Sequence, residues 1–287
     1  MSLAIVYTRA ALGIEAPLIT VEVHLSNGLP GLTMVGLPET TVKEARDRVR
    51  SALINSGYAF PAKKITINLA PADLPKEGGR YDLPIALALL VASEQLNTTR
   101  LNQYEFVGEL ALTGGLRGVP GAIPSAMEAI KAGRRIVVSS DNAAEVGLIG
   151  GSDCLVADHL QEVCAFLAGQ TSLSPPLAEA PARDERYEDL LDVIGQQQGK
   201  RALEIVAAGG HNLLLIGPPG TGKTMLASRL PGLLPPLSNQ EALESAAIQS
   251  LVNLHTAKTR WRQRPFRAPH HSASLAAMVG GGSIPVP

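Results

Sequence analysis

An apolar run leads directly into a glycine-rich segment at residues 211–230, which read HNLLLIGPPGTGKTMLASRL. Residues 217–224 fit the pattern G-x-x-x-x-G-K-[ST], and residues 212–216 before them have the composition of a buried strand. The residues that follow have the spacing of an amphipathic helix. A strand, a glycine-rich loop and a helix in this order are the setting of a phosphate-binding loop, so the sequence predicts such a loop here.

Each residue type in this loop has a physical reason. Glycines allow the positive φ angles that turn successive backbone N–H groups inward around an anion. We expect Lys223 to reach the β- and γ-phosphates of ATP and the Thr224 hydroxyl to bind Mg²⁺. The following helix directs its positive end at the phosphates. The predicted nucleotide-binding residues of the loop are Gly217, Pro218, Pro219, Gly220, Thr221, Gly222, Lys223, Thr224 and Met225.

The composition predicts two domains and a cytoplasmic protein. A chain of 287 residues can form two hydrophobic cores. Its formal charge is only −1, so binding of an anionic partner would require a local basic patch. Residues 169–186 are rich in Pro, Ser, Ala and charge without helical or strand periodicity, so we expect a linker between domains at 1–168 and 187–287. The N-terminus lacks a basic signal region, and the longest apolar run, residues 83–92, is too short to cross a membrane.

The first domain has the pattern of an α/β fold with a mixed sheet. Residues 21–25 and 65–70 alternate apolar and polar side chains, as half-buried strands do, and residues 104–110 and 134–140 are further strand candidates. Helical periodicity favours helices within 41–58, 83–96, 123–133 and 158–169. Cys154 and Cys164 are expected to be reduced core thiols, because no other ligand spacing accompanies them.

The order of these elements, with NLAPADLPKEGGRYDLPIALALL followed by FVGELALTGGLRGVPGAI, resembles the Lon-type proteolytic domain of the ribosomal S5 fold class, over roughly residues 15–168. That domain uses a Ser–Lys dyad, in which the lysine activates the serine. The resemblance places Arg80 at the serine position and Pro124 at the lysine position, and neither residue can perform the role. It therefore implies a scaffold, or a surface for partners or DNA, although a dyad shifted to Ser125 stays open. Gly78 and Gly79 are interpreted as a tight turn that leads into the next helix rather than a retained functional loop.

The segment YEDLLDVIGQQQGKRALEIVAAGGHNLLLIGPPGTGKT resembles the opening of an AAA+ ATPase module. By that resemblance, residues 192–196 lie at the adenine pocket, and Val193 and Ile194 flank the base. From the residues alone, the two side chains are an apolar pair that precedes a helix, which more often belongs to a core.

Both halves together resemble the ComM/YifB family, which is related to the magnesium chelatase ATPase subunits. The match covers the chain from Met1 to Pro287, including RPFRAPHHSASLAAMVGGGSIP at 264–285. The resemblance implies a Lon-like domain followed by an AAA+ module, and a homo-hexameric DNA helicase that uses ATP to drive branch migration in natural transformation. Spacing and composition alone indicate only a P-loop ATPase.

The C-terminal stretch offers its own indication of a nucleic-acid partner. No acidic residue follows Glu244, while five basic residues fall within ten positions and Trp261 and Phe266 lie among them. Cations and aromatic rings suit a phosphate backbone and unstacked bases, but a solvated loop or a subunit interface explains the same composition. His270 and His271 have no third ligand spaced for a metal. The candidate nucleic-acid contacts are Lys258, Arg260, Arg262, Arg264 and Arg267.

The sequence holds part of a hydrolytic site. Phosphoryl transfer also needs acidic residues that hold Mg²⁺ and orient water, and after Thr224 only Glu241 and Glu244 are acidic, in a segment with helical periodicity. We therefore expect a longer protein whose acidic strand lies beyond residue 287, and binding of ATP without efficient hydrolysis by residues 1–287. Three hypotheses follow: a DNA-remodelling motor, a chelatase-like ATPase that remodels a metal-inserting partner, and a non-enzymatic nucleotide-binding adaptor.

Overall fold

The computed structural model describes residues 2–36, 42, 44–176, 187–251, 261–270 and 272–274. The chain divides into two compact units, each of which combines two segments of the sequence. The first unit comprises Met1–Ala180 and Leu243–Thr259, and the second comprises Pro181–Ala242 and Arg260–Pro287.

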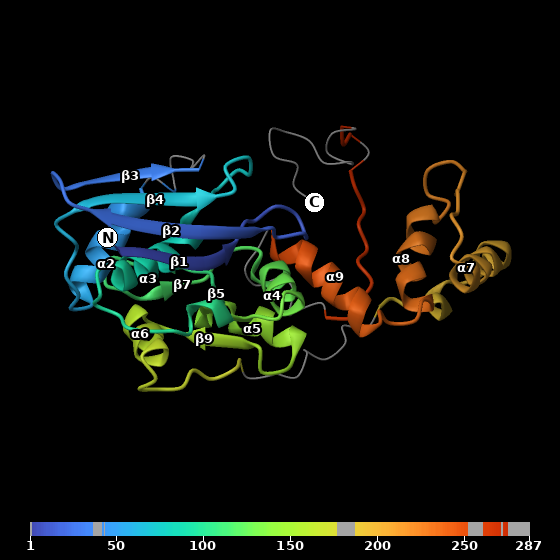
Figure 1. Cartoon of the computed structure of the whole chain (residues 1–287). Helices are drawn as coiled ribbons and strands as arrows, with labels where there is room; N and C mark the ends of the chain where they lie inside the picture. The colour runs from blue at the N-terminus through green and yellow to red at the C-terminus, as the bar shows by residue number, and fades with distance from the viewer. Residues whose placement is uncertain are drawn as a thin grey trace. The chain divides into compact units, whose positions relative to one another are not determined.

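A mixed β-sheet forms the centre of the first unit (Figure 1), as expected for its α/β pattern. In the described residues the strand order is β3-β4-β2-β1-β5-β8-β9. The pairs β1–β2 and β2–β4 are antiparallel and the other neighbours are parallel. The strands are β1 (Ser2–Arg9), β2 (Leu18–Ser26), β3 (Gly31–Val35), β4 (Lys64–Ala70), β5 (Tyr104–Phe106), β8 (Arg135–Ser139) and β9 (Cys154–Ala157).

Helices lie between some of the strands along the chain, and a separate small sheet pairs β6 (Glu109–Leu110) with β7 (Leu116–Arg117). The α-helices of residues 1–176 that the structure describes are α2 (Ala45–Asn55), α3 (Asp82–Ala92), α4 (Ala122–Lys131), α5 (Ala143–Val146) and α6 (Leu160–Leu167). Short 3₁₀ turns are η1 (Gly79–Tyr81), η2 (Leu101–Gln103), η3 (Ser140–Asn142) and η4 (Gly147–Ile149). Throughout the described ranges, every helix is too short or too polar to cross a membrane.

The antiparallel part of the sheet has one face toward solvent and one face packed on the core. Side chains of β2 alternate between buried and partly exposed along the whole strand, which is the pattern of a sheet with one solvated face. Helix α3, whose residues are almost all buried, packs against β1 and β2 on the other face. This is why residues 83–92 are continuously apolar without being a membrane segment.

The parallel part of the sheet is covered on both faces. In β8, Val137 belongs to the main core with α3 and α6, whereas Ile136 and Val138 belong to a second cluster with α4 and α5. A strand with two buried faces loses the alternation that marks β2. Both cysteines lie in these cores as free thiols, as predicted, and burial raises the pKa of each to about 11.

The single strand predicted at residues 104–110 is wrong, because two strands of different sheets share this segment. The chain bends between β5 and β6, where the Val107 N–H donates to the carbonyl of Val137 and the Gly108 N–H donates to that of Arg80. Local periodicity cannot detect this bend, since both hydrogen-bond partners are distant in sequence.

The first residues of the predicted linker pack against the first unit instead of spanning a gap. The Val156 N–H of edge strand β9 donates to the Ser174 carbonyl at 3.1 Å, and Leu173 packs on the main core. Pro175 and Pro176 follow and cannot donate to β9, so pairing ends there. Residues 177–186 of the predicted linker lie outside the described residues.

The second unit has a small helical core in the ranges that the structure covers. Its 3₁₀ turn η5 (Leu190–Asp192) precedes α7 (Gln197–Gly209) and α8 (Lys223–Leu233). Leu190, Val193, Leu203 and Leu226 are its buried apolar cluster. Helix α9 (Asn239–Ser250), predicted from its helical pattern, begins in this unit, and its residues from Leu243 belong to the first.

Candidate nucleotide-binding site

The glycine-rich loop lies between two helices that pack tightly. Helix α7 ends at Gly209, and Gly210 caps it with a φ of 62° before the chain runs back to the loop at 217–222. The two helices approach at Gly199, where a Cβ would lie only 2.8 Å from the Leu226 side chain on α8. A glycine at this position therefore fixes how closely α8 sits beside α7.

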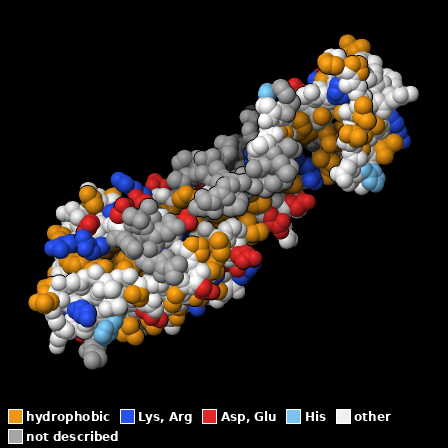
Figure 2. Space-filling view, turned by 90° about the horizontal axis from the view of Figure 1, so that it is seen from above, with side chains coloured by type: hydrophobic (Ala, Val, Ile, Leu, Met, Phe, Trp, Pro, Cys, Tyr) orange, Lys and Arg blue, Asp and Glu red, His pale blue; other side chains and the backbone are white. Residues whose placement is uncertain are grey.

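The buried strand predicted at residues 212–216 is not present. These residues are in no strand, and Leu214 and Ile216 are 80% and 86% exposed. Figure 2 shows apolar side chains open to the surface on this unit. None of the described residues of the second unit is in a strand, so residues 212–216 have no neighbouring strand in that unit with which to form a sheet.

The loop itself has the backbone that the motif predicts. Gly220 and Gly222 have φ angles of 83° and 82°, in the left-handed region that favours glycine. Gly222 is the N-cap of α8 and has no side chain to bond the first amides, and the first intrahelical bond runs from the Leu226 N–H to the Gly222 carbonyl. The amides of the first turn are therefore available to an anion at the positive end of the helix.

Lys223 folds back over the loop. Its Nζ donates to the carbonyls of Gly217 and Pro218 at 2.8 and 2.7 Å. The Thr221 hydroxyl donates to the same Pro218 carbonyl at 2.9 Å. The ammonium group thus lies across the segment that the motif assigns to phosphate, while the neighbouring Thr224 is exposed.

Gln196 is a loop contact that the sequence reasoning missed. Its side-chain amide donates to the Thr221 carbonyl at 3.3 Å, and its own φ is 54°, in the left-handed region. The residue ends the segment 192–196 that resembles an adenine pocket, so the resemblance was the signal that could have identified it. Gln196 connects that segment directly to the phosphate loop.

The two residues predicted to flank the adenine base lie in different surroundings. Val193 is buried in the core cluster of α7 and α8, whereas Ile194 is 95% exposed. Val193 therefore has the packing role that its apolar character alone favours, and Ile194 is open to a ligand. The adenine contact stays a prediction for both residues.

The described arginines of the basic stretch hold a loop together. The Arg262 Nε donates to the Leu237 carbonyl at 2.9 Å, and the Leu237 N–H donates back to the Arg262 carbonyl. The Arg264 Nε donates to the Pro235 carbonyl at 2.7 Å, while Arg267 is exposed. Lys258, Arg260 and His271 lie outside the described residues, and contact with nucleic acid stays a prediction for the stretch.

The two acids that follow the loop in sequence lie on α9, as predicted, and Glu241 has a structural role. The Ser238 N–H donates to the Glu241 carboxylate at 2.8 Å, and the Glu241 N–H donates to the Ser238 hydroxyl at 3.3 Å. This reciprocal pair is a capping box at the start of the helix. These bonds lower the pKa of Glu241.

In the first unit, Arg80, which the resemblance aligns with the serine of the dyad, contacts Ser125, the neighbour of Pro124. Gly78 and Gly79 lead through η1 into α3, as the turn interpretation predicted. The buried Arg80 guanidinium donates to the Arg9 carbonyl at 3.2 Å, to the Pro120 carbonyl, and to the Ser125 hydroxyl at 3.5 Å. The Ser125 hydroxyl donates to the Gly121 carbonyl at 2.8 Å. Its proton is thus bound to a carbonyl oxygen and its oxygen faces a cation, which is the opposite of an activated nucleophile.

Comparison with known proteins identifies the family of the chain. Residues 21–142 match the family model described as subunit ChlI of Mg-chelatase, and residues 189–287 match magnesium chelatase, subunit ChlI. The chain is 77% identical to the protein YifB of Salmonella typhimurium and 58% identical to competence protein ComM of Haemophilus influenzae. Each match covers 100% of this chain and 57% of the relative. The chain belongs to the ComM/YifB family.

Membership in the ComM/YifB family identifies the chain as part of a ChlI-like AAA+ ATPase family. The coverage is consistent with the expectation of a longer protein. The family model that matches residues 21–142 is itself described as a chelatase subunit, so the first domain does not separate this chain from chelatase subunits.

Proposed function

We propose that this chain carries the nucleotide-binding part of an ATP-driven motor of the ComM type, which remodels DNA as a full-length hexamer. The observation that carries the proposal is the phosphate loop at 217–222. Two left-handed glycines shape it, Lys223 lies across it, and the first turn of α8 leaves its amides available. The 58% identity to a competence protein supports the choice of DNA as the substrate class.

The residues present fit a nucleoside triphosphate with Mg²⁺. Backbone amides and one ammonium group offer donors and positive charge without a competing carboxylate on the loop. Lys223 would exchange its two carbonyl acceptors for phosphate oxygens, which are stronger acceptors because they are charged. Thr224, exposed at the first turn of α8, would supply its hydroxyl to the metal, and bound Mg²⁺ would neutralise phosphate charge.

A second candidate, remodelling of a metal-inserting protein partner, draws on a different observation. Both family models that match the chain are described as magnesium chelatase subunits. The candidates share the ATP site and differ in what the motor moves. Binding of forked DNA by the full-length protein, coupled to ATP turnover, favours the first. A protein partner that stimulates turnover while DNA has no effect favours the second.

A titration of labelled ATP tests whether the loop at 217–224 binds the nucleotide. Lys223→Ala should weaken ATP binding at least tenfold, and more for ATP than for ADP, because the γ-phosphate loses its cationic partner. Thr224→Ala should weaken binding mainly when Mg²⁺ is present, because its hydroxyl acts through the metal. Lys63→Ala, which removes an exposed lysine from the first unit, is the matched control and should change nothing. Equal ATP affinity in the Lys223 variant and the control would refute the site.

Phosphate release separates binding from turnover. We expect residues 1–287 to hydrolyse ATP negligibly while the full-length protein hydrolyses it, since the Glu241 carboxylate is engaged in capping α9. Sustained turnover by residues 1–287 that is lost on Lys223→Ala would contradict this expectation. The same result would leave the ATP-binding proposal intact.

A further inference from the structure

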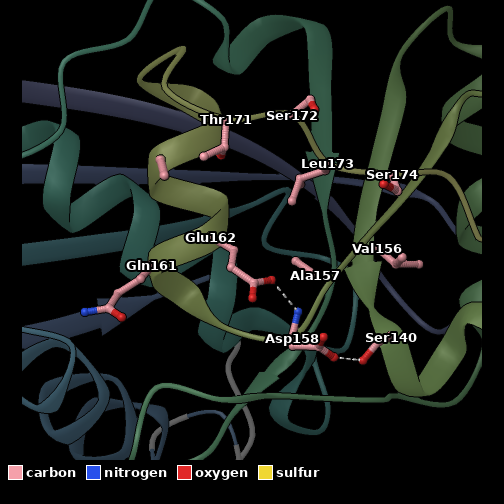
Figure 3. Close-up of a pocket in the computed structure, with 11 residues that line it drawn as sticks. Ser140, Val156, Ala157, Asp158, Gln161, Glu162, Thr171, Ser172, Leu173 and Ser174 are labelled. Atoms are coloured by element: carbon pink, nitrogen blue, oxygen red, sulfur yellow. Dashed lines mark hydrogen bonds between the residues drawn. The ribbon is translucent and has the colours of Figure 1, made fainter.

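A cavity in the first unit is lined by residues between 140 and 174 and includes no residue of the phosphate loop. The cavity measures about 500 Å³ and lies between α6, the end of β9 and residues 171–174 (Figure 3). Its size is that of a small-molecule pocket. Ser139 and Ala157 are register partners at the ends of parallel strands β8 and β9, so Ser140 and Asp158 leave the sheet side by side. The carboxyl ends of parallel strands are where open α/β sheets place ligands.

The charge of the lining points to a cation. Asp158 and Glu162 contribute two carboxylates, and the residues that line the cavity include no lysine, arginine or histidine. In Figure 3 the Glu162 carboxylate reaches from α6 toward the backbone of Asp158, whose N–H donates to its Oε2 at 2.9 Å. The Ser140 hydroxyl donates to the Asp158 Oδ1. Each carboxylate therefore uses one oxygen to hold the local fold, and the described residues give neither acid a salt-bridge partner.

The rest of the lining defines what kind of cation fits. Leu173, Ala157 and Ala165 contribute carbon surface to the lining, so methylene groups can be buried. Ser172 and Ser174 add hydroxyl acceptors to the polar part. A bare metal ion fits poorly, because only two carboxylates line the cavity and the described residues contain no metal-binding group of three His, Cys, Asp or Glu side chains. We propose that this cavity binds an ammonium or guanidinium group carried on a short apolar stem.

A helix-capping role alone is the competing explanation for the two acids. Acids before and within the first turn of α6 stabilise the helix through its dipole and its free amides. That role uses one oxygen of Glu162 and leaves the cavity unexplained. Glu162→Gln separates the two roles, because the amide oxygen can keep the bond from the Asp158 N–H while the charge is lost.

Amide NMR shifts of ¹⁵N-labelled chain titrated with butylguanidinium test the proposal, with butylurea as the neutral isostere. We expect saturable shifts confined to residues 140, 156–162 and 171–174, and no saturation by butylurea. Glu162→Gln should weaken binding about tenfold, the loss of one charged hydrogen bond. Asp158→Asn, which keeps an acceptor for Ser140, is the second variant. Glu15→Gln, an exposed acid outside the cavity, is the control.

A capped Gly-Arg-Gly peptide distinguishes the two sources of such a cation. Binding at least as tight as that of butylguanidinium identifies an arginine side chain of a polypeptide, and weaker binding identifies a free small molecule. Shifts caused equally by butylurea would overturn the proposal. So would unchanged affinity in both acid variants.

Discussion

Glu145 on α5 is a buried carboxyl group whose replacement should change how stability depends on pH. One oxygen accepts from the Asn142 side chain at 3.3 Å, and the other has no hydrogen-bond partner in the structure. Burial raises the pKa of Glu145 to about 7, and the Asn142 bond offsets only part of this rise. Glu145→Gln removes the charge and keeps a carbonyl acceptor for Asn142.

The sign and size follow from the two pKa values. Below pH 4.5 the group is protonated in the folded and unfolded chain, and its contribution to stability is fully present. As pH rises from 4.5 through 7, the unfolded chain ionises first, so the free energy of unfolding falls. At about 1.36 kcal/mol per pKa unit, the wild type should lose about 2.5 kcal/mol between pH 5 and pH 8 that the glutamine variant does not lose.

Urea unfolding at pH 5 and pH 8, followed by tyrosine near-UV circular dichroism, measures this difference. Four of the five tyrosines lie in the first unit, so the signal reports on the unit that contains Glu145. Asp82, whose pKa burial raises to about 6, titrates equally in both proteins and cancels. A difference between wild type and variant that is the same at both pH values would refute the reasoning. Glu15→Gln should show no such change.

Two further predictions concern the first unit and the basic stretch. The chain should cleave no casein or peptide under any nucleotide condition, and proteolysis that disappears on Ser125→Ala would show a shifted dyad. Charge reversal at Arg267 should weaken binding to forked DNA and lower the slope of log affinity against log salt by about one. Arg267 is the cleanest choice, because Arg262 and Arg264 also hold the loop at 235–237. Unchanged affinity with impaired self-association would instead assign Arg267 to a subunit interface.

Some elements with one exposed face could be predicted from the sequence, because their periodicity records the boundary between core and solvent, although β1 and β3 were missed. Strand β2 and helices α4 and α6 are of this kind. Strand β9, buried on both faces, gave no such pattern and was missed. The conformation of the phosphate loop was also predictable, because the motif places glycines at positions 220 and 222, where the backbone has a positive φ.

Features that depend on distant partners could not be predicted. The break between β5 and β6 depends on Val137 and Arg80, and nothing near residue 107 indicates either. Residues 212–216 have the composition of a buried strand, but composition does not say whether neighbouring strands are present to pair with it. The contact of Gln196 with the loop required the fold of the intervening helix α7.

The contacts of Arg80 limit which residues can replace it. A serine at position 80 would be too short to replace the guanidinium, so the buried Arg9 carbonyl and the Pro120 carbonyl would both lose this donor. Replacing Arg80 by serine would therefore destabilise the first unit. A Ser–Lys pair at the two positions that the resemblance assigns would need several substitutions made together, because Arg80 carries these contacts and position 124 holds a proline.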